Sequence, residues 1–157
     1  MTFFNSKISA IKTIRLSPNT QLSTNNWQYL SGSRITYTPS KNAQNVIYQF
    51  SYGWHKSSND DNLAHIKMVS GSNENEINSS PSDVYGINFN VGATNAYSRG
   101  NVTLKRTIPA WQGEKIIQLN FRHYSNSFVV ETNDIDFWNG SAASNPINCH
   151  LVVYSVE

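Results

Sequence analysis

The feature that most constrains this chain is a series of short segments in which apolar and polar residues alternate. Residues 45–52 and 84–91 carry apolar or aromatic side chains at every second position, and within residues 115–124 the same holds for Ile117, Leu119 and Phe121. Successive residues of a β-strand face opposite sides of a sheet, so this period is typical of strands with one buried face. Clusters of Asn, Ser, Asp and Gly separate the segments, and these residues suit tight turns. Helix signals are almost absent, and the pattern predicts an all-β protein.

The complete set of predicted strands indicates a two-layer fold. The segments expected to form strands are 8–16, 34–38, 45–52, 63–69, 84–91, 101–107, 115–124 and 148–156, the first being also compatible with a helix. Many short strands at a spacing of roughly 8–12 residues are typical of a β-sandwich or barrel. A polar, turn-rich stretch follows the first segment. We therefore expect residues 1–23 to be an N-terminal arm or first strand, and residues 24–157 to form the main domain.

Composition excludes several classes of protein. The 157 residues carry a net charge of only +2 and include a single cysteine, Cys149. One cysteine cannot form an internal disulfide or a zinc site built from several cysteines. So small a charge does not favour nucleic acid as a partner. No apolar run approaches the roughly 20 residues of a membrane span, and the N-terminus lacks the apolar core of a signal peptide. We therefore expect neither membrane insertion nor secretion.

One stretch carries a family resemblance. Residues 35–50 read ITYTPSKNAQNVIYQF, an aromatic strand, a proline, a turn and then a second aromatic strand. This resembles the hallmark of the complement-globular-head and tumour-necrosis-factor-like jelly rolls, and the matching positions are Tyr37, Pro39, Tyr48 and Phe50. Over residues 27–157 the resemblance implies a two-sheet antiparallel jelly-roll sandwich, which in that family assembles as a homotrimer.

A second resemblance concerns function. The segments NVIYQF, LAHIKM, NFRHY and DFWNG look like parts of short jelly-roll proteins of large DNA viruses and phages. That likeness implies a structural protein located in the virion, such as a minor capsid, decoration or fibre-knob protein. Its expected partners are copies of itself and other virion proteins.

The last predicted strand supports self-association. Leu151 and Val153 alternate with Val152, Tyr154 and Val156, so both faces of this strand are apolar. A strand that is apolar on both faces is usually buried on both faces. The second face therefore needs a cover, which is either a neighbouring copy or a loop or arm of the same chain. For the first case we expect aromatic residues near the oligomer axis, namely Tyr48, Phe50, Tyr124 and Tyr154.

Enzymatic chemistry is not indicated. The sequence has no nucleophile motif, no motif that pairs two carboxylates, and no metal-ligand spacing among its 4 histidines. Cys149 lies in an apolar strand, where a thiol is buried and unreactive rather than nucleophilic. We predict a non-enzymatic protein without a cofactor or a transition-metal site. The acidic loops at 60–62 and 133–136 could hold Ca²⁺ or could simply form turns.

Loop residues suggest an alternative function, in which the chain is a lectin-like module that binds a cell-surface glycan or receptor. Trp residues next to turns can stack on sugar rings, and neighbouring acidic side chains can bind hydroxyl groups. The alternative for these Trp residues, Trp111 included, is that they cap the ends of the core. The residues expected to bind a ligand are Trp54, Asp60, Asp61, Asp134, Asp136 and Trp138.

Overall fold

The computed structural model describes residues 8–16, 20–22, 26–30, 32–56, 62–79, 83–91, 98–123, 130–132 and 149–157. Side chains are described for residues 26–30, 32–52, 66–77, 103–122 and 149–157. Strands dominate, as the alternation predicts. The elements are β1 (Ile8–Leu16), β2 (Thr20–Leu22), β3 (Gln28–Tyr29), β4 (Ile35–Tyr37), β5 (Asn45–Lys56), β6 (Asn62–Gly71), α1 (Glu74–Ser79), β7 (Asp83–Val91), β8 (Ser98–Pro109), β9 (Lys115–His123), β10 (Val130–Thr132) and β11 (Cys149–Val156).

The strands pair as a nested series of antiparallel ribbons. β6 pairs with β7, β5 with β8, β4 with β9, and β1 with β11. The shorter pairs β3 with β9 and β2 with β10 follow the same order. Each pair therefore encloses the next, and α1 lies at the innermost turn. A long antiparallel ribbon wound in this way is a jelly roll, as the sequence predicts.

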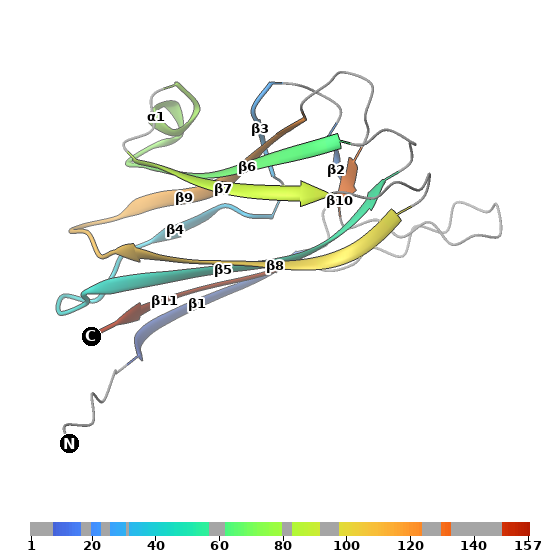
Figure 1. Ribbon diagram of the computed structural model, residues 1–157. Coiled ribbons are helices and arrows are strands. Elements are labelled where there is room, and N and C mark those ends of the chain that lie inside the picture. The colour runs from blue at the N-terminus through green and yellow to red at the C-terminus, as the bar shows by residue number, and fades with distance from the viewer. Residues whose placement is uncertain are drawn as a thin grey trace.

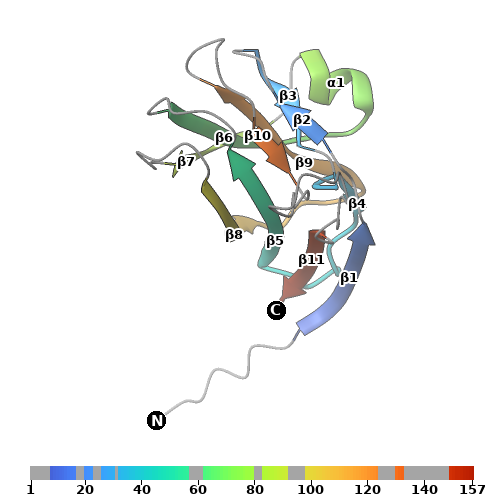
Figure 2. The same cartoon turned by 90° about the vertical axis from the view of Figure 1, so that its right-hand side faces the viewer.

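Winding the ribbon produces two facing sheets (Figures 1 and 2). Sheet A has the order β1-β11-β5-β10-β2, with β8 on the other side of β5. Sheet B has the order β3-β9-β6-β7, with β4 also paired to β9. We call the side of each sheet that faces away from the other sheet its outer face.

The core lies between the sheets and follows the predicted alternation. From sheet B, Ile117, Leu119 and Phe121 are at most 3% exposed. From sheet A, Tyr48 and Phe50 are 1% and 0% exposed. The strands therefore direct their predicted apolar faces inward, and this burial is the main favourable contribution to folding.

Two tyrosine hydroxyl groups make hydrogen bonds within this core. The Tyr48 hydroxyl donates to the backbone carbonyl of Ser33, and burial raises the pKa of Tyr48 well above its ordinary value. The Tyr37 hydroxyl lies 2.7 Å from Oγ of Ser155, which joins β4 of sheet B to β11 of sheet A. Because each hydroxyl has a partner, the aromatic rings are buried without the cost of an unpaired polar group.

The short helix α1 is an element that the alternation does not predict. Asn73 caps it, since its Oδ1 accepts a 2.9 Å hydrogen bond from the backbone N–H of Glu76. Oε2 of Glu76 in turn accepts from the N–H of Ser72. Ile77 is 2% exposed and packs on the end of β6. A Cβ on Gly71 would lie 3.0 Å from Cγ1 of Ile77, so glycine permits this close approach.

The N-terminal segment contributes to the sandwich. Residues 8–16 form β1 along the whole of β11, and residues 20–22 form β2 beside β10. Both strands belong to sheet A. The boundary between residues 23 and 24 stays a prediction. Within the part of the chain that the structure describes, no helix has the length and apolar character needed to span a membrane.

Candidate functional site

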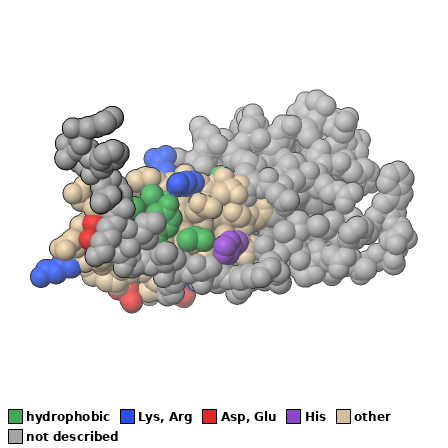
Figure 3. Space-filling model, turned by 90° about the horizontal axis from the view of Figure 1, so that it is seen from below, with side chains coloured by type: hydrophobic (Ala, Val, Ile, Leu, Met, Phe, Trp, Pro, Cys, Tyr) green, Lys and Arg blue, Asp and Glu red, His purple; other side chains and the backbone are tan. Residues whose placement is uncertain are grey.

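The outer face of sheet A carries an apolar patch, which we define as Ile47, Val152, Tyr154 and Val156. Along β11, buried residues alternate with exposed or half-exposed ones, so Leu151 and Val153 face the core and the patch residues face outward. Ile47 lies opposite Tyr154 on the neighbouring strand β5. Figure 3 views the molecule from the side of sheet A and shows hydrophobic side chains gathered beside a histidine. The patch therefore lies in the middle of a sheet rather than at its edge.

Among the described side chains, the β8 flank of the apolar patch is mainly polar. On the outer face of β8, Thr103 and Thr107 are exposed, and Oγ of Ser51 lies 2.8 Å from Oγ1 of Thr103. Lys105 is the charged side chain that alternation places between these two threonines. A rim of this kind imposes little electrostatic repulsion on a second molecule that approaches the face.

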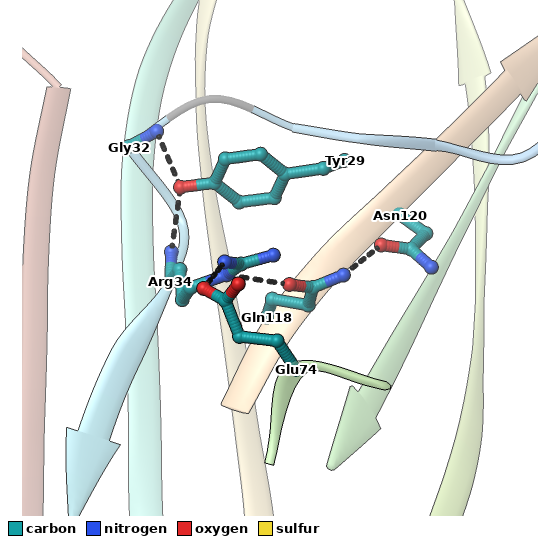
Figure 4. Close-up of polar contacts among 6 residues, drawn as sticks. All are labelled: Tyr29, Gly32, Arg34, Glu74, Gln118 and Asn120. Carbon is teal, nitrogen blue, oxygen red and sulfur yellow. Dashed lines mark hydrogen bonds and ion pairs between the residues drawn. The ribbon is translucent and has the colours of Figure 1, made fainter. Parts of the chain in front are cut away.

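The outer face of sheet B is organised by hydrogen bonds, shown in Figure 4. Arg34 donates from Nε to Oε1 of Gln118 at 2.8 Å and pairs through Nη1 with Glu74 of α1. Nε2 of Gln118 then donates to Oδ1 of Asn120 at 2.7 Å. We call this series, which runs from Glu74 to Asn120, the polar network. It links α1 to the middle of sheet B.

Tyr29 positions the arginine of the polar network (Figure 4). Its hydroxyl accepts hydrogen bonds from the backbone N–H groups of Gly32 and Arg34, at 3.1 and 3.3 Å. Gly32 has a φ of 82°, a conformation that glycine adopts without strain. The Arg34 guanidinium lies 4.7 Å from the centroid of the Tyr29 ring. The turn before β4 and the cation–π contact thus hold Arg34 over the sheet.

Two further cations lie on the same outer face, and we call them the cation pair: Lys67 of β6 and Arg122 of β9. Nζ of Lys67 is 4.4 Å, and Cζ of Arg122 is 4.6 Å, from the centroid of the Trp27 ring. In the strand register Lys67 lies opposite Asn120, two positions from Arg122. Partial burial, and secondly the charge of Arg122, lower the pKa of Lys67. Neither cation has a carboxylate partner among the described side chains.

The predicted oligomer-interface residues are divided by the structure. Tyr48 and Phe50 are 1% and 0% exposed in the core of the protomer, so their side chains cannot contact a second copy. That part of the prediction is wrong, because their shared face is directed toward sheet B rather than outward. Tyr124 lies outside the described residues. Tyr154 is half-exposed in the apolar patch, and its role at an interface stays a prediction.

The predicted ligand residues lie largely outside the described part of the chain. Trp54 falls in β5, but its side chain is not described, and Asp60, Asp61, Asp134, Asp136 and Trp138 are outside the described residues altogether. Sugar or calcium binding by these loops stays a prediction. Trp111 behaves as a core cap: it packs against the core, with its ring centroid 6.2 Å from that of Tyr37.

The residues considered for catalysis and metal binding are placed only in part. Cys149 is 1% exposed, which agrees with the buried thiol that the sequence predicts. His150 is exposed on β11, and the side chains of the other histidines are not described. Within the described residues, no group of three or more His, Cys, Asp or Glu side chains is arranged to hold a metal ion.

The sequence matches no known family model and no curated protein. Among solved structures, the chain is similar to the VP2 protein of infectious bursal disease virus in a subviral particle, with 13% identity and a TM-score of 0.49. That alignment covers 94% of this chain and 38% of the viral one. The Gx and Gt strains of the same virus give identities of 14% and 16% and TM-scores of 0.47 and 0.45. These alignments cover 95% and 98% of this chain and 40% of each viral chain.

The chain thus spans about two fifths of the length of the viral proteins with which it aligns. The jelly-roll assignment rests on the strand pairing of this chain itself.

Proposed function

We propose that this chain is a non-enzymatic structural protein of a virion, such as a minor capsid, decoration or fibre-knob component. In this proposal it assembles as a homo-oligomer, with three copies arranged around an axis, and it also contacts other virion proteins. The observation that carries the proposal is the apolar patch on the outer face of sheet A. The location in a virion is proposed from the resemblance of sequence segments to short viral jelly rolls, and the number of three copies from the resemblance to tumour-necrosis-factor-like jelly rolls.

The apolar patch supports assembly because of its position. Val152, Tyr154 and Val156 belong to β11, which lies between β1 and β5 and has both sheet neighbours in place. Their outward side chains are therefore not needed to complete the sandwich. Apolar residues gathered on an outer face indicate an interaction surface more often than isolated ones do.

A second copy of the chain is the occupant that the surface chemistry favours. The patch is apolar, its described flank along β5 and β8 carries threonine and serine hydroxyl groups with one outward cation, Lys105, and the whole chain has a net charge of +2. Copies of such a protein repel one another only weakly. A symmetric oligomer also buries the same patch on every copy, so no separate complementary surface has to exist.

Light scattering behind a sizing column tests the assembly. We expect a mass near three times the 17.7 kDa of the chain for the wild type. A mass of 17.7 kDa over a hundredfold range of concentration would overturn the homo-oligomer. The virion role has its own test, which is mass spectrometry of density-banded particles from the source of the sequence. Absence of the chain from particles that yield their other structural proteins would contradict that role.

A further inference from the structure

The cation pair on the outer face of sheet B is not explained by self-assembly through sheet A. Lys67 and Arg122 extend from neighbouring antiparallel strands, on the same face and at diagonal positions of the register. Like charges at neighbouring positions of a sheet destabilise it. The fold nevertheless places both cations at one aromatic ring, that of Trp27.

The third cation of this face provides an internal comparison. Arg34 contacts the Tyr29 ring in the same manner, but its guanidinium is also paired with Glu74 and bonded to Gln118. Lys67 and Arg122 make the ring contacts as well, but neither has a carboxylate partner among the described side chains. Nε of Arg122 is moreover buried without a hydrogen-bond acceptor among the described residues. A buried donor without an acceptor costs stability, on the order of 1–3 kcal/mol.

These observations indicate the chemistry of a ligand that would suit this surface. A negatively charged ligand at the half-exposed side chains of Lys67 and Arg122 is favoured, because it offsets two cations at once. Lysine supplies a point charge and arginine a planar fork, and both bind carboxylate, sulfate and phosphate oxygens. The ring of Trp27 keeps the two cations on one side of the sheet while leaving them half-exposed.

We propose that Lys67, Arg122 and Trp27 form a binding site for an oxyanion, in the form of a carboxylate, sulfate or phosphate group of a ligand. The Lys67 ammonium and the Arg122 guanidinium donate hydrogen bonds to the anion. Trp27 positions both cations, and its ring does not contact the bound anion. The polar network beside the site links β9 to α1 and leaves Asn120 next to Lys67 in the register.

Titration calorimetry of the full-length chain at low ionic strength tests the site. The probes are sodium sulfate, a sulfated disaccharide and N-acetylneuraminic acid, whose acidic groups are a free oxyanion, a sugar sulfate and a sugar carboxylate. We expect saturable binding of at least one probe. Binding of sulfate alone identifies the free oxyanion as the ligand, and stronger binding of a saccharide assigns the group to an acidic sugar.

Variants assign the binding to the cation pair. Lys67→Gln and Arg122→Gln should each weaken binding about tenfold, the effect of losing one charge-assisted hydrogen bond. The matched control is Lys105→Gln, which removes an exposed cation from sheet A and should leave the affinity unchanged. Lys67→Met replaces Lys67→Gln if that variant does not fold. The proposal is overturned if no probe binds saturably, or if the control weakens binding as much as the two site variants.

Discussion

The outer faces of the two sheets are built on the same strand alternation but expose different chemistry. On sheet A, the outward residues Val152, Tyr154 and Val156 of β11 are apolar and half-exposed, and the fourth outward residue, His150, is exposed. On sheet B, Gln118 and Asn120 face outward yet are 1% and 9% exposed, and they belong to a network that ends on α1. The outer face of sheet A thus retains exposed apolar area. On the outer face of sheet B, hydrogen bonds between side chains fix the positions of Gln118 and Asn120.

In the two proposals above, this difference separates the surface for assembly from the surface for ligand recognition. Apolar contact tolerates a smooth sheet surface, because the hydrophobic effect is not directional. An oxyanion site instead needs donors at fixed positions, and the ring of Trp27 and the neighbouring network provide that order. The two surfaces lie on opposite sides of a shared core, so a change to one should leave the other intact. The predictions below test that independence.

The largest effect is expected from a charge in the apolar patch. Tyr154→Arg should convert the oligomer into a monomer of 17.7 kDa, because burying an unpaired guanidinium at an interface is costly. Light scattering measures the mass, and Gln112→Arg, at an exposed turn, is the matched control. The affinity for the oxyanion probe should be unchanged in both variants. A Tyr154→Arg protein with the wild-type mass would show that sheet A is not the interface.

The next largest effect is a difference in the free energy of unfolding between a variant on the sheet B side and a variant on sheet A. Ile77 is 2% exposed, so Ile77→Ala should reduce the free energy of unfolding by about 2–4 kcal/mol. Val152→Ala removes a half-exposed side chain and should cost less than about 1 kcal/mol in the monomer. Chemical denaturation of both variants in the Tyr154→Arg background measures this without a contribution from assembly. Equal losses would mean that sheet A is as tightly covered within the protomer as sheet B.

A smaller effect is expected at the ion pair of the polar network. The side chains of Arg34 and Glu74 are 27% and 68% exposed, so solvent and salt screen their attraction. Glu74→Gln should therefore lower the free energy of unfolding by only about 0.5 kcal/mol, and less at high salt. Denaturation at two salt concentrations measures it. A loss above about 2 kcal/mol would show that this pair, rather than the packing of Ile77, holds α1 on the sheet.

The smallest effect concerns the titration of Lys67. Burial and the charge of Arg122 lower the pKa of Lys67 in the folded chain. At pH values between this folded-state pKa and the higher pKa of the unfolded chain, the unfolded state therefore binds more protons. This group therefore increases stability as pH rises through that interval. In Arg122→Gln the pKa of Lys67 should move upward, since one of its two causes is removed. Heteronuclear NMR of the Lys67 side chain measures the pKa directly, and an unchanged value would contradict the charge coupling within the cation pair.

Much of the fold could be predicted from the alternation. The predicted strands at 45–52, 63–69 and 115–124 correspond to β5, β6 and β9, with boundaries that differ by a few residues. β2, β3 and β10 are only two or three residues long, too short for a period to be visible. α1 has six residues, and its signal is a cap, Asn73 with Glu76 three positions later, rather than a periodic pattern.

The candidate sites were predictable only in part, because alternation groups residues by face without saying what that face meets. Tyr48 and Phe50 do share one face, but whether an aromatic face is a core or an interface depends on the position of the opposite sheet. Lys67 and Arg122 each lie on the polar face of a predicted strand. Their proximity follows from the pairing of β6 with β9, which the local sequence of either strand does not specify.

The central claim is that sheet A is the assembly face and that sheet B remains accessible to a ligand. A crystal structure of the assembled protein, grown with the tightest-binding oxyanion probe, tests both parts most directly. The account predicts that Val152 and Tyr154 of neighbouring copies are in contact and that the probe lies on Lys67 and Arg122, away from the interface. An assembly that buries Trp27 and leaves the apolar patch in solvent would contradict it.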